Sequence, residues 1–189
     1  MTDTLKVIQL SYGDPENPNK EIICRDRILQ WMNEKDLNIL GALYSYLMRS
    51  NYSQRIEPPL EFKHYKIFFL NYYRRCLIED NLSDDPEVYL MSKYEAGWDM
   101  ANWILSLQNE HSIKGKELNN AMLDIKRLLG ELYTFGSIEL QNCLITAVLE
   151  HIFTNKKIAN FFKDWESDNA LREAYQSSLM YSKKLIQKK

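Results

Sequence analysis

Apolar residues recur every three to four positions along most of this chain, with polar residues between them. This spacing places the apolar side chains on one face of an α-helix, where they can pack against a neighbouring element. Apolar–polar alternation with a period of two, which is typical of strands, is absent beyond residue 20. The pattern predicts helices over residues 20–33, 37–50, 59–80, 86–110, 116–134, 137–154, about 158–165, and 168–187.

Capping and turn residues set the predicted boundaries. Asp36 and Asp85 are expected N-caps, because a short acidic side chain can accept a hydrogen bond from the first free N–H groups of a helix. Pro59 and Pro86 suit the first helical position, where no N–H is needed. The helix over 59–80 is apolar nearly all round, which predicts a central helix without a solvent-exposed face.

Short connections between the predicted helices favour antiparallel neighbours. We therefore predict an all-α fold, a single-domain antiparallel multi-helix bundle of about seven or eight helices over residues 20–189. The alternative is an irregular solenoid of helical pairs, because the helices come in pairs although no fixed repeat length recurs. Residues 1–19 include a cluster of Gly, Pro, Asn and Asp, which predicts a flexible N-terminal arm.

Composition narrows the class of protein. The formal net charge of −2 argues against a nucleic-acid partner, because nucleic-acid-binding domains are usually strongly basic. No apolar run approaches the roughly 18 residues of a membrane span, so we predict a cytoplasmic protein without a membrane partner. Cys24, Cys76 and Cys143 are far apart and lack metal-binding spacing, which predicts reduced cysteines in the core.

Charge is distributed unevenly along the chain. Residues 79–110 contain eight acidic residues and one base, Lys93, whereas residues 49–76 contain six bases and two acids. In an antiparallel hairpin, Arg74 or Arg75 would meet the acids of the next helix within the molecule. The alternative is an acidic surface that docks a basic partner, because complementary charge speeds and orients docking. The residues expected to dock are Asp84, Asp85 and Glu87.

A polar and aromatic face is predicted in the helix over 86–110. Its residues are Tyr94, Glu95, Trp98, Asp99 and Asn102. The three polar members share one face at i, i+4 and i+7. Such a face can be a buried hydrogen-bonded network that Arg75 or tyrosine hydroxyls satisfy. It can also be a binding site for a small molecule or a protein, or a catalytic carboxylate pair.

Gly97 in the middle of the same helix disfavours helix formation by about 1 kcal/mol relative to Ala. A glycine there indicates either a close approach of another helix or a gap. The predicted helix over 137–154 also has an apolar face, and Ile138 belongs to it.

Motifs for metal ions, cofactors and nucleophilic catalysis are missing. Glu61 and His64 form the only Glu-x-x-His pair, whereas a di-iron bundle needs two. Neither a nucleophile elbow nor a glycine-rich phosphate loop occurs. We therefore predict no cofactor and no metal site.

Residues 85–103 contain Asp85-Pro-Glu-Val-Tyr89 and Ser92-Lys-Tyr-Glu-Ala-Gly-Trp-Asp99. This stretch resembles one in small uncharacterised bacterial all-helical proteins, which implies a bacterial source and no particular activity. From the residues we predict a non-enzymatic protein-interaction module, such as an immunity or adaptor protein, that docks a basic partner through the acidic segment. The alternatives are a small-ligand binder or enzyme with a pocket around residues 94–102, and a self-associating structural protein that forms a homodimer.

Overall fold

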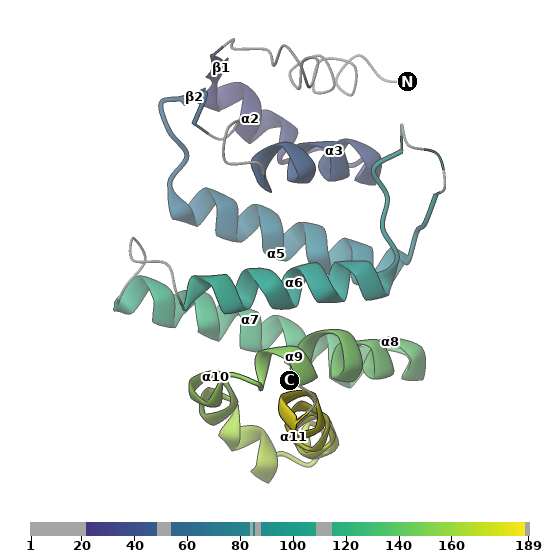
Figure 1. Ribbon diagram of the computed structural model, residues 1–189. Helices are drawn as coiled ribbons and strands as arrows, with labels where there is room; N and C mark the ends of the chain where they lie inside the picture. The colour runs from purple at the N-terminus through teal and green to yellow at the C-terminus, as the bar shows by residue number, and fades with distance from the viewer. Residues whose placement is uncertain (1–21, 49–53, 84, 86–87, 109–114, 188–189) are drawn as a thin grey trace. The chain divides into compact units, whose positions relative to one another are not determined.

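The computed structural model describes residues 22–48, 54–83, 85, 88–108 and 115–187 (Figure 1). Most of these residues are helical, so the prediction of an all-α fold is confirmed. The helices are α2 (Arg25–Trp31), α3 (Leu37–Met48), α5 (Phe62–Glu79), α6 (Lys93–Leu107), α7 (Lys116–Phe135), α8 (Ile138–Cys143), α9 (Glu150–Ile152), α10 (Lys156–Phe161) and α11 (Arg172–Gln187). A π-helical stretch, η1 (Leu144–Leu149), joins α8 to α9, and a 3₁₀ turn, η2 (Lys163–Ser167), follows α10. The predicted arm, residues 1–19, lies outside the described residues.

Backbone contacts divide the chain into two compact units. Unit 1 comprises residues 1–76 and 81–91, and unit 2 comprises residues 77–80 and 92–189. Helix α5 therefore begins in unit 1, and its last residues belong to unit 2. The single-domain bundle over residues 20–189 stays a prediction.

The core of unit 1 is an aromatic cluster between α3 and α5. The Tyr44 ring stacks on Tyr72 with 4.8 Å between centroids and meets Phe69 and Tyr73 edge-on. The hydroxyl oxygens of Tyr44 and Tyr73 are 2.9 Å apart, so the buried polar ends of these rings are hydrogen-bonded. Phe68 packs against the same cluster. In Figure 1, α2 and α3 lie along one side of α5.

Two strands of two residues each, β1 (Ile23–Cys24) and β2 (Ile56–Glu57), pair in parallel in unit 1. The prediction of a helix start at residue 20 is therefore wrong, because α2 begins at Arg25. A two-residue strand is too short to show alternation in the sequence.

An extended segment after residue 87 lies against α3 in unit 1. The Tyr89 N–H donates to the Asn38 side-chain oxygen. A Cβ atom on Gly41 would lie 1.8 Å from the Tyr89 carbonyl oxygen, so only glycine permits this approach. These contacts explain why residues 88–92 are not helical, and the prediction of a helix from residue 86 is wrong.

Helix α5 has an exposed side, so the prediction that it lacks one is wrong. Ile67 and Ile78 are 64% and 55% exposed, and Asn71 and Arg74 are exposed between them. The helix begins at Phe62 rather than at Pro59.

Capping side chains fix the starts of α3 and α6. Asp36 accepts a hydrogen bond from the Asn38 N–H at 2.9 Å, which confirms it as the cap of α3. Helix α6 begins at Lys93 with Ser92 as its N-cap, so the prediction that Asp85 is the cap is wrong. Ser92 and Glu95 form a reciprocal capping box, which satisfies N–H groups that would otherwise lack a partner.

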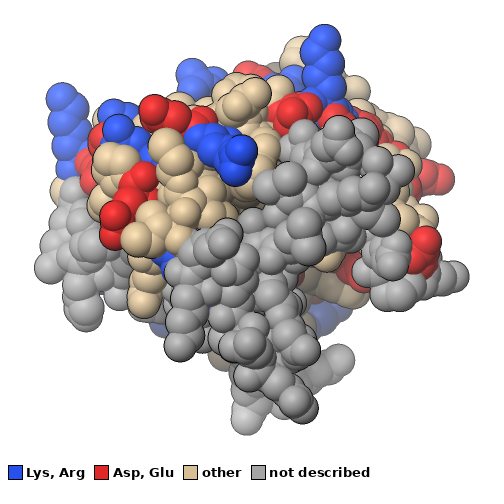
Figure 2. Space-filling view, turned by 90° about the horizontal axis from the view of Figure 1, so that it is seen from above, with Lys and Arg blue, Asp and Glu red and all other residues tan. Residues whose placement is uncertain are grey.

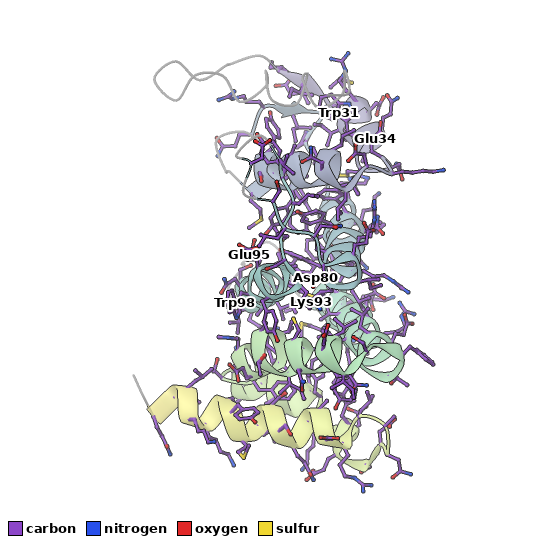
Figure 3. The ribbon with its side chains drawn as sticks, turned by 90° about the vertical axis from the view of Figure 1, so that its right-hand side faces the viewer. Trp31, Glu34, Asp80, Lys93, Glu95 and Trp98 are labelled. Atoms are coloured by element: carbon purple, nitrogen blue, oxygen red, sulfur yellow. The ribbon has the colours of Figure 1, made fainter. Side chains whose placement is uncertain are left out.

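Helix α6 packs on the π-helical stretch η1 in unit 2. A Cβ atom on Gly97 would lie 2.7 Å from the Ala147 Cβ and 3.3 Å from the Val148 Cγ2. Gly97 therefore marks a close helix–helix approach, which is one of the two alternatives that its position indicates. Figures 1 and 3 show α11 crossing α6 rather than running along it.

Polar and aromatic contacts fasten α7 to the segment after α9. The Lys126 ammonium group donates to the Phe161 carbonyl oxygen at 2.9 Å and pairs with Asp164. Its Nζ also lies 5.1 Å from the centre of the Phe161 ring. The Phe162 ring meets Trp165 edge-on at 4.9 Å.

None of the helices among the described residues is both long and apolar enough to cross a membrane. The three cysteines are free. Cys76 and Cys143 are buried, as predicted, but Cys24 is exposed, so the prediction that it belongs to the core is wrong.

Candidate functional site

The outer face of α6 carries the candidate residues. The residues of the helix that pack inward are Ala96, Gly97, Met100, Ala101, Trp103, Ile104 and Leu107. Tyr94 and Trp98 remain 42% and 48% exposed, and their ring centroids are 6.4 Å apart. Glu95 and Asn102 are exposed beside them, and Asp99 is half-buried. The hypothesis of a buried polar network is therefore wrong for Glu95 and Asn102, and these five residues form an accessible surface, the α6 face.

Glu95 has a structural role at the start of the helix. The backbone N–H and the hydroxyl of Ser92 both donate to Glu95 Oε2 at 2.9 Å. The Glu95 N–H donates back to Ser92 Oγ at 3.3 Å. An acidic side chain in the first turn is also favoured by the helix dipole. The capping box thus fixes the first turn of α6, which carries Tyr94, and Trp98 follows one turn later.

Lys93 links three segments of unit 2 behind this face. Its ammonium group contacts Asp80 Oδ2 at 2.9 Å and Glu139 Oε2 at 3.2 Å, and its backbone N–H donates to Asp80 Oδ1 at 2.8 Å. These bonds hold the pKa of the Asp80 carboxyl below its usual value, and the contact with Asp80 raises the pKa of Lys93. In Figure 3, Lys93 and Asp80 lie together, whereas Glu95 and Trp98 lie towards the edge of the helix. The single base of the acidic segment is thus already paired within the molecule.

The thiol of Cys143 lies on the inner side of α6. Its Sγ donates to the Lys93 carbonyl oxygen at 3.3 Å. Burial raises the pKa of this thiol to about 12. A thiol that stays protonated is a weak nucleophile, so Cys143 is a packing residue.

The corner between α7 and α8 exposes two large apolar residues. Phe135, the last residue of α7, is 85% exposed, and Ile138, the first residue of α8, is 75% exposed. Glu139, which follows, is the residue that contacts Lys93. Sequence reasoning missed this pair, because the helical pattern counts Ile138 with the apolar face of its helix. The only sequence signal was the break at Gly136 and Ser137.

Acidic residues are concentrated in the segments that Lys93 joins. Residues 77–80, 92–99 and 131–139 contain Glu79, Asp80, Glu95, Asp99, Glu131 and Glu139, with Lys93 as their only base. By contrast, basic and acidic side chains are interspersed over the coloured part of the face in Figure 2. We call this set of three segments the acidic end of unit 2.

The other predicted acidic docking residues are only partly described. Asp85 is exposed in unit 1, and its N–H donates to Ser83 Oγ. Asp84 and Glu87 lie outside the described residues. Arg75, expected to meet an acid of the next helix, donates to the Lys35 carbonyl oxygen at 2.7 Å.

A small pocket lies elsewhere in unit 2, between α7 and α10. It has a volume of about 190 Å³ and contains none of the candidate residues of α6. Its lining is Gln108, Gly115, Leu118, Asn119, Met122, Lys157, Ile158 and Phe161. It is smaller than the usual ligand site of about 300–1,000 Å³.

Two titratable side chains lie together in α9. Glu150 Oε1 is 3.6 Å from His151 Nε2, and burial raises the pKa of the Glu150 carboxyl. Within the part of the chain that the structure describes, no group of three or more His, Cys, Asp or Glu side chains is placed to hold a metal ion.

No protein family, curated protein or solved structure matches this chain significantly. The geometry of the α6 face is therefore the main basis for a functional proposal.

Proposed function

We propose that this protein is a protein-interaction module, of the immunity or adaptor type, that docks a basic partner through the α6 face. The observation that carries the proposal is the exposure of Tyr94 and Trp98 side by side on successive turns of α6. Exposed Trp and Tyr side chains are the residues that most often dominate binding energy in protein interfaces.

The charge around these rings supports a cationic partner. Glu95 and Asp99 flank Trp98 on the same helix, and the acidic end of unit 2 has six acids against one base. A guanidinium or ammonium group can lie over an indole face while it pairs with a neighbouring carboxylate. A basic surface rich in Arg is thus complementary to the α6 face, because its guanidinium groups can both stack on the aromatic rings and pair with the carboxylates.

The same charge disfavours the alternative of a homodimer through this face. Two copies would place carboxylates opposite carboxylates, and like charges in an interface cost several kcal/mol. An enzyme with Glu95 as a catalytic carboxylate is also less well supported, because Glu95 Oε2 already accepts two hydrogen bonds from Ser92.

Affinity capture from the source cell, followed by a binding measurement with the purified partner, tests the proposal. Trp98→Ala should raise the Kd by roughly 30-fold, which corresponds to about 2 kcal/mol, because an interfacial anchor is lost. Met180→Ala is the matched control, since Met180 is 47% exposed on α11, away from the α6 face. The affinity should also fall as salt screens the charges.

Equal affinity of the Trp98→Ala variant and the wild type would refute the proposal. A partner with an acidic contact surface would refute the charge argument, even if Trp98 proved to be an anchor.

A further inference from the structure

The corner between α7 and α8 exposes apolar side chains on a turn that several contacts fix. A Cβ atom on Gly136 would lie 2.3 Å from the Leu132 carbonyl oxygen, so the turn is closed against α7. Ser137 Oγ accepts from the Leu140 N–H at 3.2 Å and caps α8. The Gln141 side chain donates to the Tyr133 carbonyl oxygen at 2.9 Å and ties the two helices together. The backbone that carries Phe135 and Ile138 is therefore fixed by contacts within unit 2.

This corner is fastened to the start of α6. Glu139, adjacent to Ile138, contacts the Lys93 ammonium group, and Lys93 directly precedes Tyr94. Helices α6 and α8 also pack on each other. The corner and the start of α6 are thus parts of one framework within unit 2.

The exposure of this pair calls for an explanation. Single exposed apolar residues are common on protein surfaces. Here, however, two large ones are separated by only two residues, and a Phe side chain alone offers about 150–250 Å² of surface for burial. Adjacent apolar residues with a polar surround are typical of interaction sites.

We infer that Phe135 and Ile138 are a second, apolar anchor for the partner of the α6 face, and that this partner presents a cationic segment carrying apolar side chains. The inference rests on the proposed function and extends it to the corner. The acidic end of unit 2 disfavours other occupants by charge: an anionic lipid surface, a nucleic acid and a second copy that docks through the same segments would each bring negative charge to it. A cationic and apolar segment can pair with the carboxylates and cover both side chains.

The test uses three short synthetic peptides of equal length, with Lys and Leu, Lys and Ser, or Glu and Leu residues, and measures binding by fluorescence anisotropy. The wild type should bind the Lys/Leu peptide at least about tenfold more tightly than the Lys/Ser peptide, because only the former can cover the corner. The Glu/Leu peptide should bind most weakly, because its charge is repelled.

A double variant, Phe135→Ser with Ile138→Ser, isolates the corner. It should reduce the affinity for the Lys/Leu peptide to that for the Lys/Ser peptide. Leu123→Ser is the matched control and should change neither affinity, since Leu123 is 49% exposed on α7, more than three turns before the corner. Because all three side chains are exposed, the variants should keep the wild-type circular dichroism spectrum and melting temperature.

The outcomes separate the inference from the proposed function. Equal wild-type affinity for the Lys/Leu and Lys/Ser peptides, or an unchanged affinity in the double variant, overturns the inference. If Trp98→Ala still weakens both cationic peptides in that case, the proposed function stands. If Trp98→Ala changes nothing while the double variant loses binding, the α6 face is the part that fails.

Discussion

Aromatic residues on helices behave differently in the two units. In unit 1, the rings of Tyr44 and Tyr73 are at most 5% exposed, and their hydroxyl groups bond to each other. In unit 2, Tyr94 and Trp98 lie one helical turn apart, and nearly half of each side chain is exposed. Both pairs are made of large rings, yet only the first is covered by another helix.

The difference shows that residue type alone does not decide what an aromatic side chain does. A covered ring stabilises the fold through burial and packing, whereas an uncovered ring is available for a partner.

Removal of a ring from each region should have very different effects on stability. Phe68→Ala should lower the free energy of unfolding by about 3–5 kcal/mol, because Phe68 is only 2% exposed and its loss leaves a cavity. Trp98→Ala should change this free energy by about 0.5 kcal/mol or less. Urea unfolding followed by circular dichroism measures both. A comparable loss in both variants would mean that Trp98 belongs to the core.

Gly97 allows α6 to pack closely on η1. Gly97→Ala should lower the free energy of unfolding by about 1–3 kcal/mol, because the new methyl group would overlap Ala147. Gly130→Ala is the matched control in α7, where the nearest atom to a new Cβ, Trp165 Cζ2, is 3.5 Å away. That change should raise the free energy by up to about 1 kcal/mol, because Ala is the better helix former. Thermal unfolding of both variants should therefore shift in opposite directions.

Removal of a tyrosine hydroxyl should affect the free energy of unfolding in unit 1 but not on the α6 face of unit 2. Tyr44→Phe should lower the free energy of unfolding by about 1 kcal/mol, because the hydrogen bond between the two buried hydroxyls is lost. The double variant with Tyr73→Phe should cost less than the sum of the single changes, as expected for directly bonded groups. Tyr94→Phe, on the exposed pair, should leave the free energy of unfolding unchanged. Additive effects at Tyr44 and Tyr73 would show that the hydroxyl contact contributes nothing.

Helix boundaries with a strong local signal were predictable. The apolar period over 116–134 agrees with α7 within one residue, and Asp36 caps α3 as its side-chain chemistry indicates. The start of α6 was missed although Ser92 and Glu95 have the spacing of a capping box. Apolar residues before Ser92 extended the helical pattern, but Tyr89 in the structure is held by Asn38 of α3. That hydrogen bond joins residues far apart in the chain, so no local pattern reveals it.

The candidate site was only half predictable, for a related reason. The residues of the α6 face were found from their spacing, because i, i+4 and i+7 positions share a face in any helix. Their exposure could not be found in this way, and Phe135 and Ile138 were missed. An apolar side chain is buried only if a neighbouring element covers it, and the turn at Gly136 leaves both of these uncovered.

Local patterns in the amino-acid sequence are sufficient to predict that this protein is helical, where most of its helices lie and which side chains share a face. These properties depend on interactions between residues a few positions apart. The tertiary structure alone decided that β1 pairs with β2, that Gly97 admits η1 against α6, and that Tyr94 and Trp98 face outward while Tyr44 and Tyr73 are enclosed. Burial is a property of two surfaces that meet, so it follows only when the chain has brought distant segments together.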